Sequence, residues 1–250
     1  MRLSANLGFL WTELPLPDAI RAAAKAGFLA VECHFPYDVD PDQVNAALRE
    51  TGLPMIGLNT VRGDGLGLSA LVGREADARA AIDQAIEYAV KINTGMVHVM
   101  AGIAEGQAAH ETFIANLRYA LGKAAPHNIT LLIEPLSSID NPGYFLQTTV
   151  QAVNIIAEID DPNLKLMFDC YHVQVMQGDL SRRLENLLPI IGHIQIAAVP
   201  DRGEPDRGEV DYRYILRHID KIGYNGYVGA EYRPRTNTDA GLGWMQAICA

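Results

Sequence analysis

Short apolar runs alternate with amphipathic runs along the whole chain of 250 residues, and this alternation constrains the fold more than any other feature. The apolar runs have the length of buried strands, which predicts strands over residues 3–7, 30–34, 54–58, 96–100, 131–134, 164–169, 192–195 and 227–231. The runs between them predict helices over residues 19–26, 41–50, 74–92, 108–125, 148–159, 180–188 and 212–222, with a last helix from about Ala240.

Strands that alternate with helices form a parallel sheet covered by helices. Eight such repeats in 250 residues favour a closed (β/α)₈ barrel over an open doubly wound sheet. No GxGxxG motif follows the first expected strand, which argues against the usual dinucleotide-binding alternative. Because the chain has no linker and no low-complexity segment, we predict an α/β protein with a single TIM-barrel domain over residues 1–250.

Composition and charge narrow the range of partners. The formal net charge is −10, whereas a nucleic-acid partner calls for a basic face, so we expect no nucleic acid. We also expect no membrane span, because no apolar stretch approaches the ~18 residues that a span needs. The N-terminus lacks the features of a signal peptide, and Cys33, Cys170 and Cys249 match no zinc or redox motif. We therefore expect reduced thiols in a cytoplasmic protein, and the sequence leaves the oligomeric state open, a homo-oligomer included.

The last four expected strands each end on a side chain with an oxygen ligand. These residues are Glu134, Asp169, Gln195 and Glu231, about one βα unit apart. In a parallel barrel the carboxyl ends of all strands meet at one face, where active sites lie. Three carboxylates and one amide oxygen are hard ligands, suited to Mg²⁺ or Mn²⁺. The sequence therefore predicts a shared divalent metal site.

The alternative is a purely structural role, in which each of these residues caps the helix that follows it. Asp169 alone fits that interpretation well. Glu134 and Glu231 fit it poorly, because Pro135 and Tyr232 follow them in strand-like context. Three like charges at one barrel mouth would also repel one another unless a cation or protons offset them, which favours the metal site.

Two histidines are candidates for binding the substrate. His172 follows Asp169 by three residues, which places it on a loop above the same strand, either beside a substrate oxygen or simply at a helix entry. His98 ends the core of the fourth strand and either lines the pocket or is a buried structural residue. His193 shares a strand face with Gln195 but lies deeper, so we expect it to fill an interior layer of the barrel.

The other pocket candidates come from loops and from the first three strands. Arg202 lies on the loop after the Gln195 strand, where an arginine could pair with a substrate carboxylate, although a loop arginine is often only solvated. Its rivals for that role are Arg207, Arg233 and Arg235. The other wall of the pocket has candidates at or near the ends of the first three strands, namely Asn6, Glu32, His34 and Asn59.

Several segments resemble the hydroxypyruvate isomerase family, which includes 2-oxo-tetronate isomerases and lies within the xylose-isomerase-like barrels. The similar segments cover nearly the whole chain and include 4–7, 35–38, 54–59, 133–135, 141–143, 169–172, 193–197, 202–205, 208–212 and 224–232. The segment with Gln195 is the most telling, because sugar epimerases of the wider group usually have histidine there. Ser137 departs from the pattern, which often has asparagine at this position.

The resemblance implies a function for the four strand-end residues. A divalent metal ion, Mg²⁺ or Mn²⁺, would be held by Glu134, Asp169, Gln195 and Glu231, and Glu134 and Glu231 would also act as acid and base. Hydroxypyruvate and tartronate semialdehyde (2-hydroxy-3-oxopropanoate) would interconvert through an enediolate that the metal stabilises. The substrate would be a small keto acid or sugar acid, and no organic cofactor is needed.

Other functions fit the same barrel. An isomerase of 2-dehydrotetronate and a ketose 3-epimerase would use a similar metal site. An endonuclease acting on abasic DNA would need a histidine-rich site for several metal ions and a basic surface, which the net charge of −10 argues against. A metal-stabilised binding module without catalysis is disfavoured because Glu134 and Glu231 are both present. The loop over 59–73 is long enough for a lid, but the sequence does not show whether it closes.

Overall fold

The computed structural model of the protein describes residues 1–249 and contains eight parallel strands. They are β1 (Leu3–Asn6), β2 (Ala30–Glu32), β3 (Leu58–Asn59), β4 (Met96–His98), β5 (Thr130–Ile133), β6 (Leu164–Asp169), β7 (Ile191–Ile196) and β8 (Val228–Ala230). Each lies at or beside one of the expected strands. The apolar runs therefore located all eight strands, with boundaries that differ by a few residues.

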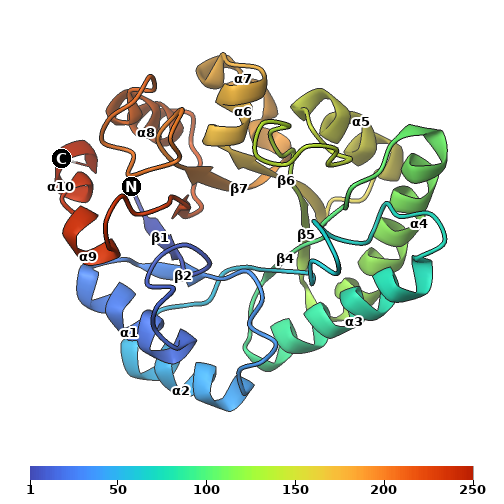
Figure 1. Ribbon diagram of the computed structural model, residues 1–250, viewed down its shortest axis with the longest axis horizontal. Helices are drawn as coiled ribbons and strands as arrows, with labels where there is room; N and C mark the ends of the chain where they lie inside the picture. The colour runs from blue at the N-terminus through green and yellow to red at the C-terminus, as the bar shows by residue number, and fades with distance from the viewer. Residues whose placement is uncertain (250) are drawn as a thin grey trace.

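The strands form a barrel in the order β2-β1-β8-β7-β6-β5-β4-β3. Regular pairing stops between β2 and β3, but backbone hydrogen bonds continue there: Val31 N–H donates to Pro54 (3.0 Å) and Cys33 N–H donates to Gly57 (3.1 Å). Residues 54–57, which were expected to form a strand, thus lie against β2 without regular strand pairing. The (β/α)₈ prediction is confirmed, with a nearly closed barrel at whose centre the strands lie (Figure 1).

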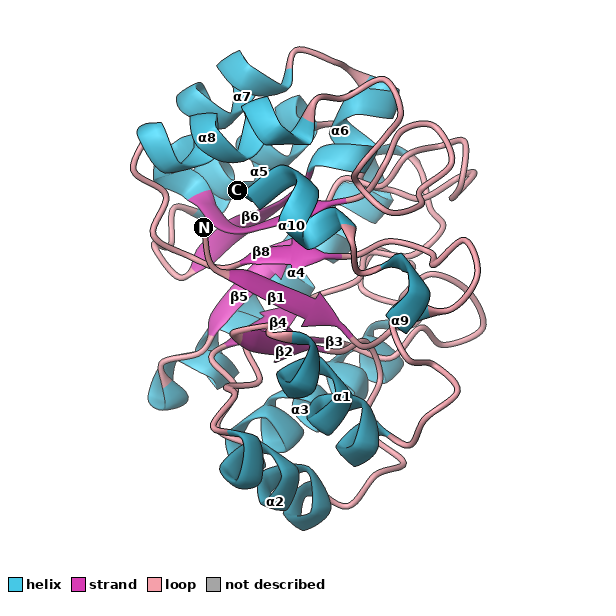
Figure 2. Ribbon diagram, turned by 90° about the vertical axis from the view of Figure 1, so that its left-hand side faces the viewer, coloured by secondary structure: helices cyan, strands magenta, loops and turns pink. Residues whose placement is uncertain are grey.

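Helices surround this barrel on the outside (Figures 1 and 2). They are α1 (Leu16–Ala26), α2 (Pro41–Thr51), α3 (Glu75–Lys91), α4 (Gly106–Ala124), α5 (Thr149–Ile159), α6 (Cys170–Met176), α7 (Leu180–Leu187), α8 (Tyr212–Lys221), α9 (Thr238–Gly241) and α10 (Trp244–Cys249), with 3₁₀ turns over Ala125–His127 and Leu188–Ile190. None of the helices in the described part of the chain combines the length and the apolarity that a membrane crossing requires.

Local sequence explains where several helices begin and end. The Thr148 hydroxyl accepts a hydrogen bond from the Gln151 N–H at the start of α5, and an N-cap of this kind satisfies a donor that the helix leaves unpaired. Gly27 ends α1 in the left-handed region (φ 92°), where glycine carries no steric cost. These ends fix the length of the connections that lead back to the barrel.

Apolar side chains fill the space between the strands and the helices in one large core, beside a small separate cluster of Leu68, Ala78 and Ala81. Cys33 and Cys170 belong to the large core as buried free thiols, while the side chain of Cys249 lies outside the described residues. Cys170 packs as expected, but as the first residue of α6 and not as part of a strand. Figure 2 shows that long loops gather at the carboxyl ends of the strands, which is the face where a (β/α)₈ barrel carries its site.

Candidate functional site

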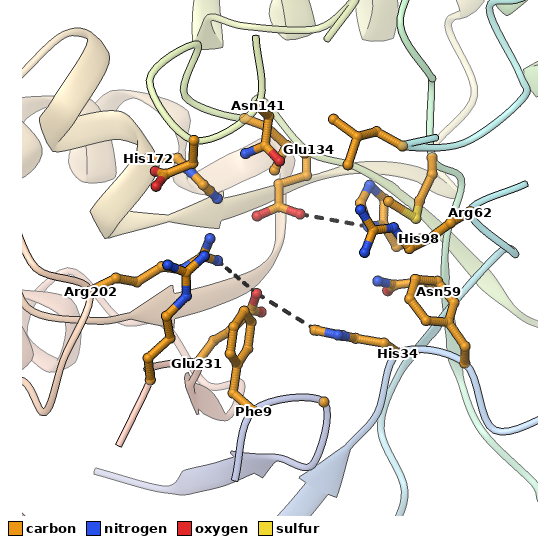
Figure 3. Close-up of a pocket in the computed structure, with 17 residues that line it drawn as sticks. Phe9, His34, Asn59, Arg62, His98, Glu134, Asn141, His172, Arg202 and Glu231 are labelled. Atoms are coloured by element: carbon orange, nitrogen blue, oxygen red, sulfur yellow. Dashed lines mark hydrogen bonds and ion pairs between the residues drawn. The ribbon is translucent and has the colours of Figure 1, made fainter. Parts of the chain in front are cut away.

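A cavity of about 370 Å³ opens at the carboxyl ends of the strands (Figure 3). Loops after most of the strands contribute to its wall. Side chains with polar or aromatic groups dominate this wall: Phe9, His34, Asn59, Arg62, His98, Glu134, Asp140, Asn141, His172, Arg202, Glu231 and Arg233. The cavity therefore combines acids, bases and cations around one open volume.

The strand-end residues reach this region because of the strand register. Asp169 is the last residue of β6 and pairs in register with Gln195 of β7. Glu134 and Glu231 directly follow β5 and β8. All four side chains are buried, with 1–6% of each residue exposed. The barrel thus brings together the four residues that the sequence predicted to share a site.

Three of these residues keep a buried oxygen without a hydrogen-bond partner among the described residues: Glu134 Oε1, Asp169 Oδ2 and Gln195 Oε1. Buried polar atoms are rarely left without a partner, because their desolvation then goes uncompensated. Carboxylate oxygens of Glu134 and Asp169 lie within 4.8 Å of each other, close enough to hold one metal ion between them. The unpartnered oxygens and their hard-ligand chemistry fit a small divalent cation such as Mg²⁺ or Mn²⁺.

Glu231 is bonded on both of its oxygens. Its Oε1 accepts a hydrogen bond from Arg202 Nη2 (2.9 Å), and its Oε2 accepts one from Asn6 Nδ2 (2.8 Å). The ring of His34 lies nearby, with Nε2 3.7 Å from Oε1. Figure 3 shows the carboxylates of Glu231 and Glu134 directed toward one another, with Arg202 beside them.

Arg202 is the buried cation of this cluster. Its Nη2 also lies 3.5 Å from Asp169 Oδ2, and only 6% of the residue is exposed. The guanidinium carbon lies 4.9 Å from the centre of the Phe9 ring and 5.1 Å from the centre of the Tyr171 ring. Aromatic faces attract cations, so both rings stabilise the charge of Arg202. Arg202 thus lies in the cavity wall on the loop after β7, and in this structure its partners are the protein's own carboxylates.

Burial and mutual repulsion govern the charge of the remaining acids. Burial raises the pKa of Asp169 to about 7, even though Arg202 opposes this rise. Burial also raises the pKa of Glu134 well above its ordinary value, and the charges of Glu231 and Asp169 add to the effect. The single positive charge of Arg202 thus does not balance the three carboxylates of the cluster.

His172 lies on α6 and not on a loop, which corrects the expectation from the sequence. Asp169 caps this short helix by accepting a hydrogen bond from the Tyr171 N–H (2.8 Å), so Asp169 both caps a helix and faces the cluster. His172 Nδ1 accepts a hydrogen bond from the Ser137 N–H (3.1 Å). Because burial also lowers the pKa of His172 well below its usual value, the ring is neutral with its proton on Nε2, which points a donor into the site.

His98 and Asn59 line the opposite side of the cavity (Figure 3). His98 is buried, and its Nδ1 lies 3.6 Å from Glu134 Oε2. Burial lowers the pKa of His98 to about 3, so this ring is also neutral. His98 is therefore buried, as in one of its two interpretations, and lies in the cavity wall, as in the other. Asn59 is the last residue of β3, and its backbone carbonyl accepts a hydrogen bond from Tyr37.

The remaining candidates separate into those at the cavity and those elsewhere. Arg233 lines the cavity, whereas Arg235 is paired with acidic side chains of the loop after β7 and Arg207 is exposed outside the cavity wall. Glu32 does not line the cavity. Burial alone would raise the pKa of Glu32, but the adjacent His193 and hydrogen bonds hold it below its ordinary value. His193 fills the interior layer as expected.

Sequence reasoning missed Phe9, Arg62 and Asp140 in the cavity wall. Phe9 supports Arg202 through its ring, and Asp140 accepts hydrogen bonds from the hydroxyls of Ser137 and Tyr171. These residues lie on loops, where no strand-end or helix periodicity marks them. Only the tertiary structure identifies their place.

Comparison with known proteins relates the whole chain to metabolic enzymes. A 2-oxo-tetronate isomerase from Cupriavidus necator is 44% identical over 253 residues, which cover 98% of this chain and 97% of the relative. A hydroxypyruvate isomerase from Escherichia coli strain K12 is 39% identical over 98% of both chains. These relatives match this chain from end to end.

Solved structures agree with this relationship. A crystal structure described as AP endonuclease, family 2, from Brucella melitensis matches with a TM-score of 0.94 and 42% identity, over 98% of both chains. The model of the xylose isomerase-like TIM barrel family matches residues 20–248. This chain belongs to the xylose isomerase-like TIM barrel family.

Proposed function

We propose that this protein is a metal-dependent isomerase of small 2-keto acids that interconverts hydroxypyruvate and tartronate semialdehyde. The relatives named as isomerases, about 40% identical over their full length, support isomerase activity. The observation that carries the proposal is the pair of carboxylates, Glu134 and Glu231, which face one cavity beside the unpartnered oxygens of Asp169 and Gln195.

In this proposal Glu134, Asp169, Gln195 and Glu231 hold one Mg²⁺ or Mn²⁺ ion. When bound, the cation supplies positive charge that stabilises the enediolate formed during the reaction. To hold the ion, the Glu231 carboxylate must bind both the ion and Arg202, which donates a hydrogen bond to Glu231 in this structure. The hydrogen bond from Asn6 to the other oxygen fixes the orientation of Glu231.

The isomerisation moves one proton between neighbouring carbons. One of the two glutamates removes a proton from the hydroxymethyl carbon of hydroxypyruvate, and a carboxylic acid returns a proton to the adjacent carbon. The hydroxyl proton passes to the former carbonyl oxygen, so the reaction needs no redox partner. Because Glu134 and Glu231 follow strands separated by β6 and β7, they reach the substrate from different sides.

Hydrogen-bond donors around the cavity would orient the substrate oxygens. His172 presents its Nε2 proton, and Arg202 has an unpartnered Nε among the described residues. Arg233 and Arg62 add positive charge to the wall, which suits an acidic substrate. These groups bind and polarise the keto acid while the glutamates move the proton.

A four-carbon substrate, 2-dehydrotetronate, is a second candidate. The relative from Cupriavidus necator is named for a 2-oxo-tetronate, and a cavity of about 370 Å³ has room for a longer acid than hydroxypyruvate. Ser137, the departure from the family pattern, acts through neighbours: its hydroxyl donates to Asp140 and its N–H donates to His172. It therefore affects how the site holds a substrate and not the acid–base pair.

We expect the purified protein with Mn²⁺ to isomerise hydroxypyruvate or 2-dehydrotetronate in a coupled assay. Treatment with EDTA should abolish turnover, and added Mn²⁺ should restore it, because the carboxylate cluster then regains its cation. Free ketoses such as fructose and tagatose serve as controls for 3-epimerase activity. Turnover of the ketoses alone, or of none of these compounds, would contradict the proposal.

The Glu231→Gln variant should lose roughly 10²–10⁴-fold in kcat, because an amide cannot exchange the proton. Its fold should persist, since glutamine has nearly the same shape. The measurement is steady-state kinetics of hydroxypyruvate isomerisation with Mn²⁺. Glu158→Gln, at a half-exposed carboxylate on α5 paired with His110, is the matched control and should keep full activity. Equal kcat in the Glu231 and Glu158 variants would exclude Glu231 as acid or base.

Arg202→Met should destabilise the metal-free protein by about 3–5 kcal/mol, because it leaves buried carboxylates without their cation. Added Mn²⁺ should then raise the melting temperature more than it does in the unmodified protein. Both effects are measured by thermal unfolding in EDTA and in Mn²⁺. Arg182→Met removes an exposed ion pair with Asp179 and should change stability by only about 0–1 kcal/mol. A variant as stable as the unmodified protein in EDTA would show that Arg202 does not balance the cluster.

A further inference from the structure

A further buried carboxylate, Glu32, lies beneath the candidate metal site. It extends from the end of β2 and is 4% exposed. Its Oε1 accepts a hydrogen bond from the Ser4 hydroxyl (2.9 Å), and its Oε2 accepts one from Gln195 Nε2 (2.9 Å). His193 Nε2 lies 3.0 Å from the same Oε2. One carboxylate thus joins side chains of three strands inside the barrel.

The barrel makes room for this carboxylate at Gly229. Gly229 of β8 pairs in register with Gln195 of β7. A Cβ atom at position 229 would lie 2.2 Å from Glu32 Oε1 and 2.9 Å from Gln195 Cγ, closer than atoms approach without displacement. Glycine therefore permits Glu32 to cross the barrel interior and reach the Gln195 amide.

The contact with Glu32 determines which way the Gln195 amide faces. The oxygen and the NH₂ group of an amide have similar shapes, so hydrogen bonds decide the orientation. An ionised carboxylate only accepts hydrogen bonds, and so it draws the NH₂ group to itself. The amide oxygen is then left on the other side, where it is buried and has no hydrogen-bond partner among the described residues.

We propose that Glu32 is a positioning residue that fixes the Gln195 amide with its oxygen free for the cation. The inference rests on the proposed function, in which Gln195 holds the metal ion. With the amide reversed, an NH₂ group would face the cation and oppose its binding. Glu32 touches neither the substrate nor the reacting atoms, so it acts through Gln195 alone.

The test exchanges the two side chains and measures Mn²⁺ binding. Metal-stripped full-length protein is titrated with Mn²⁺, and the free ion is followed by electron paramagnetic resonance. The variants are Glu32→Gln, Gln195→Glu and the double exchange, with Glu158→Gln as an exposed control and circular dichroism to verify folding. A carboxylate at position 195 has two equivalent oxygens, so in the double exchange the amide introduced at position 32 can donate to one of them and leave the other for the cation.

Glu32→Gln should weaken Mn²⁺ binding about 10–100-fold. An amide at position 32 can turn either its oxygen or its NH₂ group toward Gln195, so it no longer fixes the orientation of the Gln195 amide. The double exchange should recover most of the lost affinity, because it restores one donor and one acceptor between the two positions. Gln195→Glu alone adds a buried carboxylate that itself attracts the cation, so this variant measures the effect of the added charge. The double exchange has the same charge as the unmodified protein, and the comparison of these two proteins holds even if Glu32→Gln does not fold.

Two results would overturn the inference: Mn²⁺ affinity unchanged in a folded Glu32→Gln variant, or a folded double exchange that binds Mn²⁺ far more weakly than the unmodified protein. A failure of the proposed function would look different. The unmodified protein would then not bind Mn²⁺, or Glu134→Gln and Asp169→Asn would bind it as tightly as the unmodified protein.

Discussion

Repulsion among buried carboxylates is the constraint on which the rest of the site depends. Glu134, Asp169 and Glu231 lie at one barrel mouth, nearly without exposure to water. Charges in such a place repel strongly and are poorly screened, so the folded chain requires positive charge or protons among them. Arg202 supplies part of this charge through Glu231 and Asp169. The remaining unpartnered oxygens define where a cation would complete the balance.

The barrel topology explains why these groups meet. Strands β5, β6, β7 and β8 are neighbours in the sheet, and each contributes one of the four candidate ligands at its carboxyl end. Strands β1 and β2 support them from within the barrel, through Asn6 on Glu231 and Glu32 on Gln195. Loops after β3 and β4 bring Arg62 and Met100 to the other side of the cavity. Strands β5 to β8 thus carry the charged residues, and the loops after β3 and β4 form the opposite wall of the space in which a substrate would lie.

The sequence predicted those features that depend on local pattern. Runs such as residues 164–169 have the same bounds as the observed strand, because their apolar side chains are buried on both faces of a parallel strand. Glu134 and Glu231 were located because a carboxylate at the end of such a run is unusual. Helix α6 was not among the expected helices and was implied only by the capping alternative for Asp169. Its seven residues continue an apolar strand and are too few to show helical periodicity.

Features that depend on contacts between distant residues could not be predicted in the same way. Arg202 was expected to pair with a substrate carboxylate or to be solvated, whereas packing against Phe9 and Tyr171 and pairing with Glu231 bury it. The orientation of Gln195 depends on Glu32, which is 163 residues away along the chain. No local pattern encodes such a pairing, because register and closure of the barrel bring these side chains together.

Anomalous diffraction of Mn²⁺-soaked crystals at the manganese edge tests the shared metal site most directly. We predict one anomalous peak in the space between Glu134, Asp169, Gln195 and Glu231, with oxygens of these residues as its protein ligands. A peak ligated by other residues, or no peak in this space at full Mn²⁺ loading, would contradict the account.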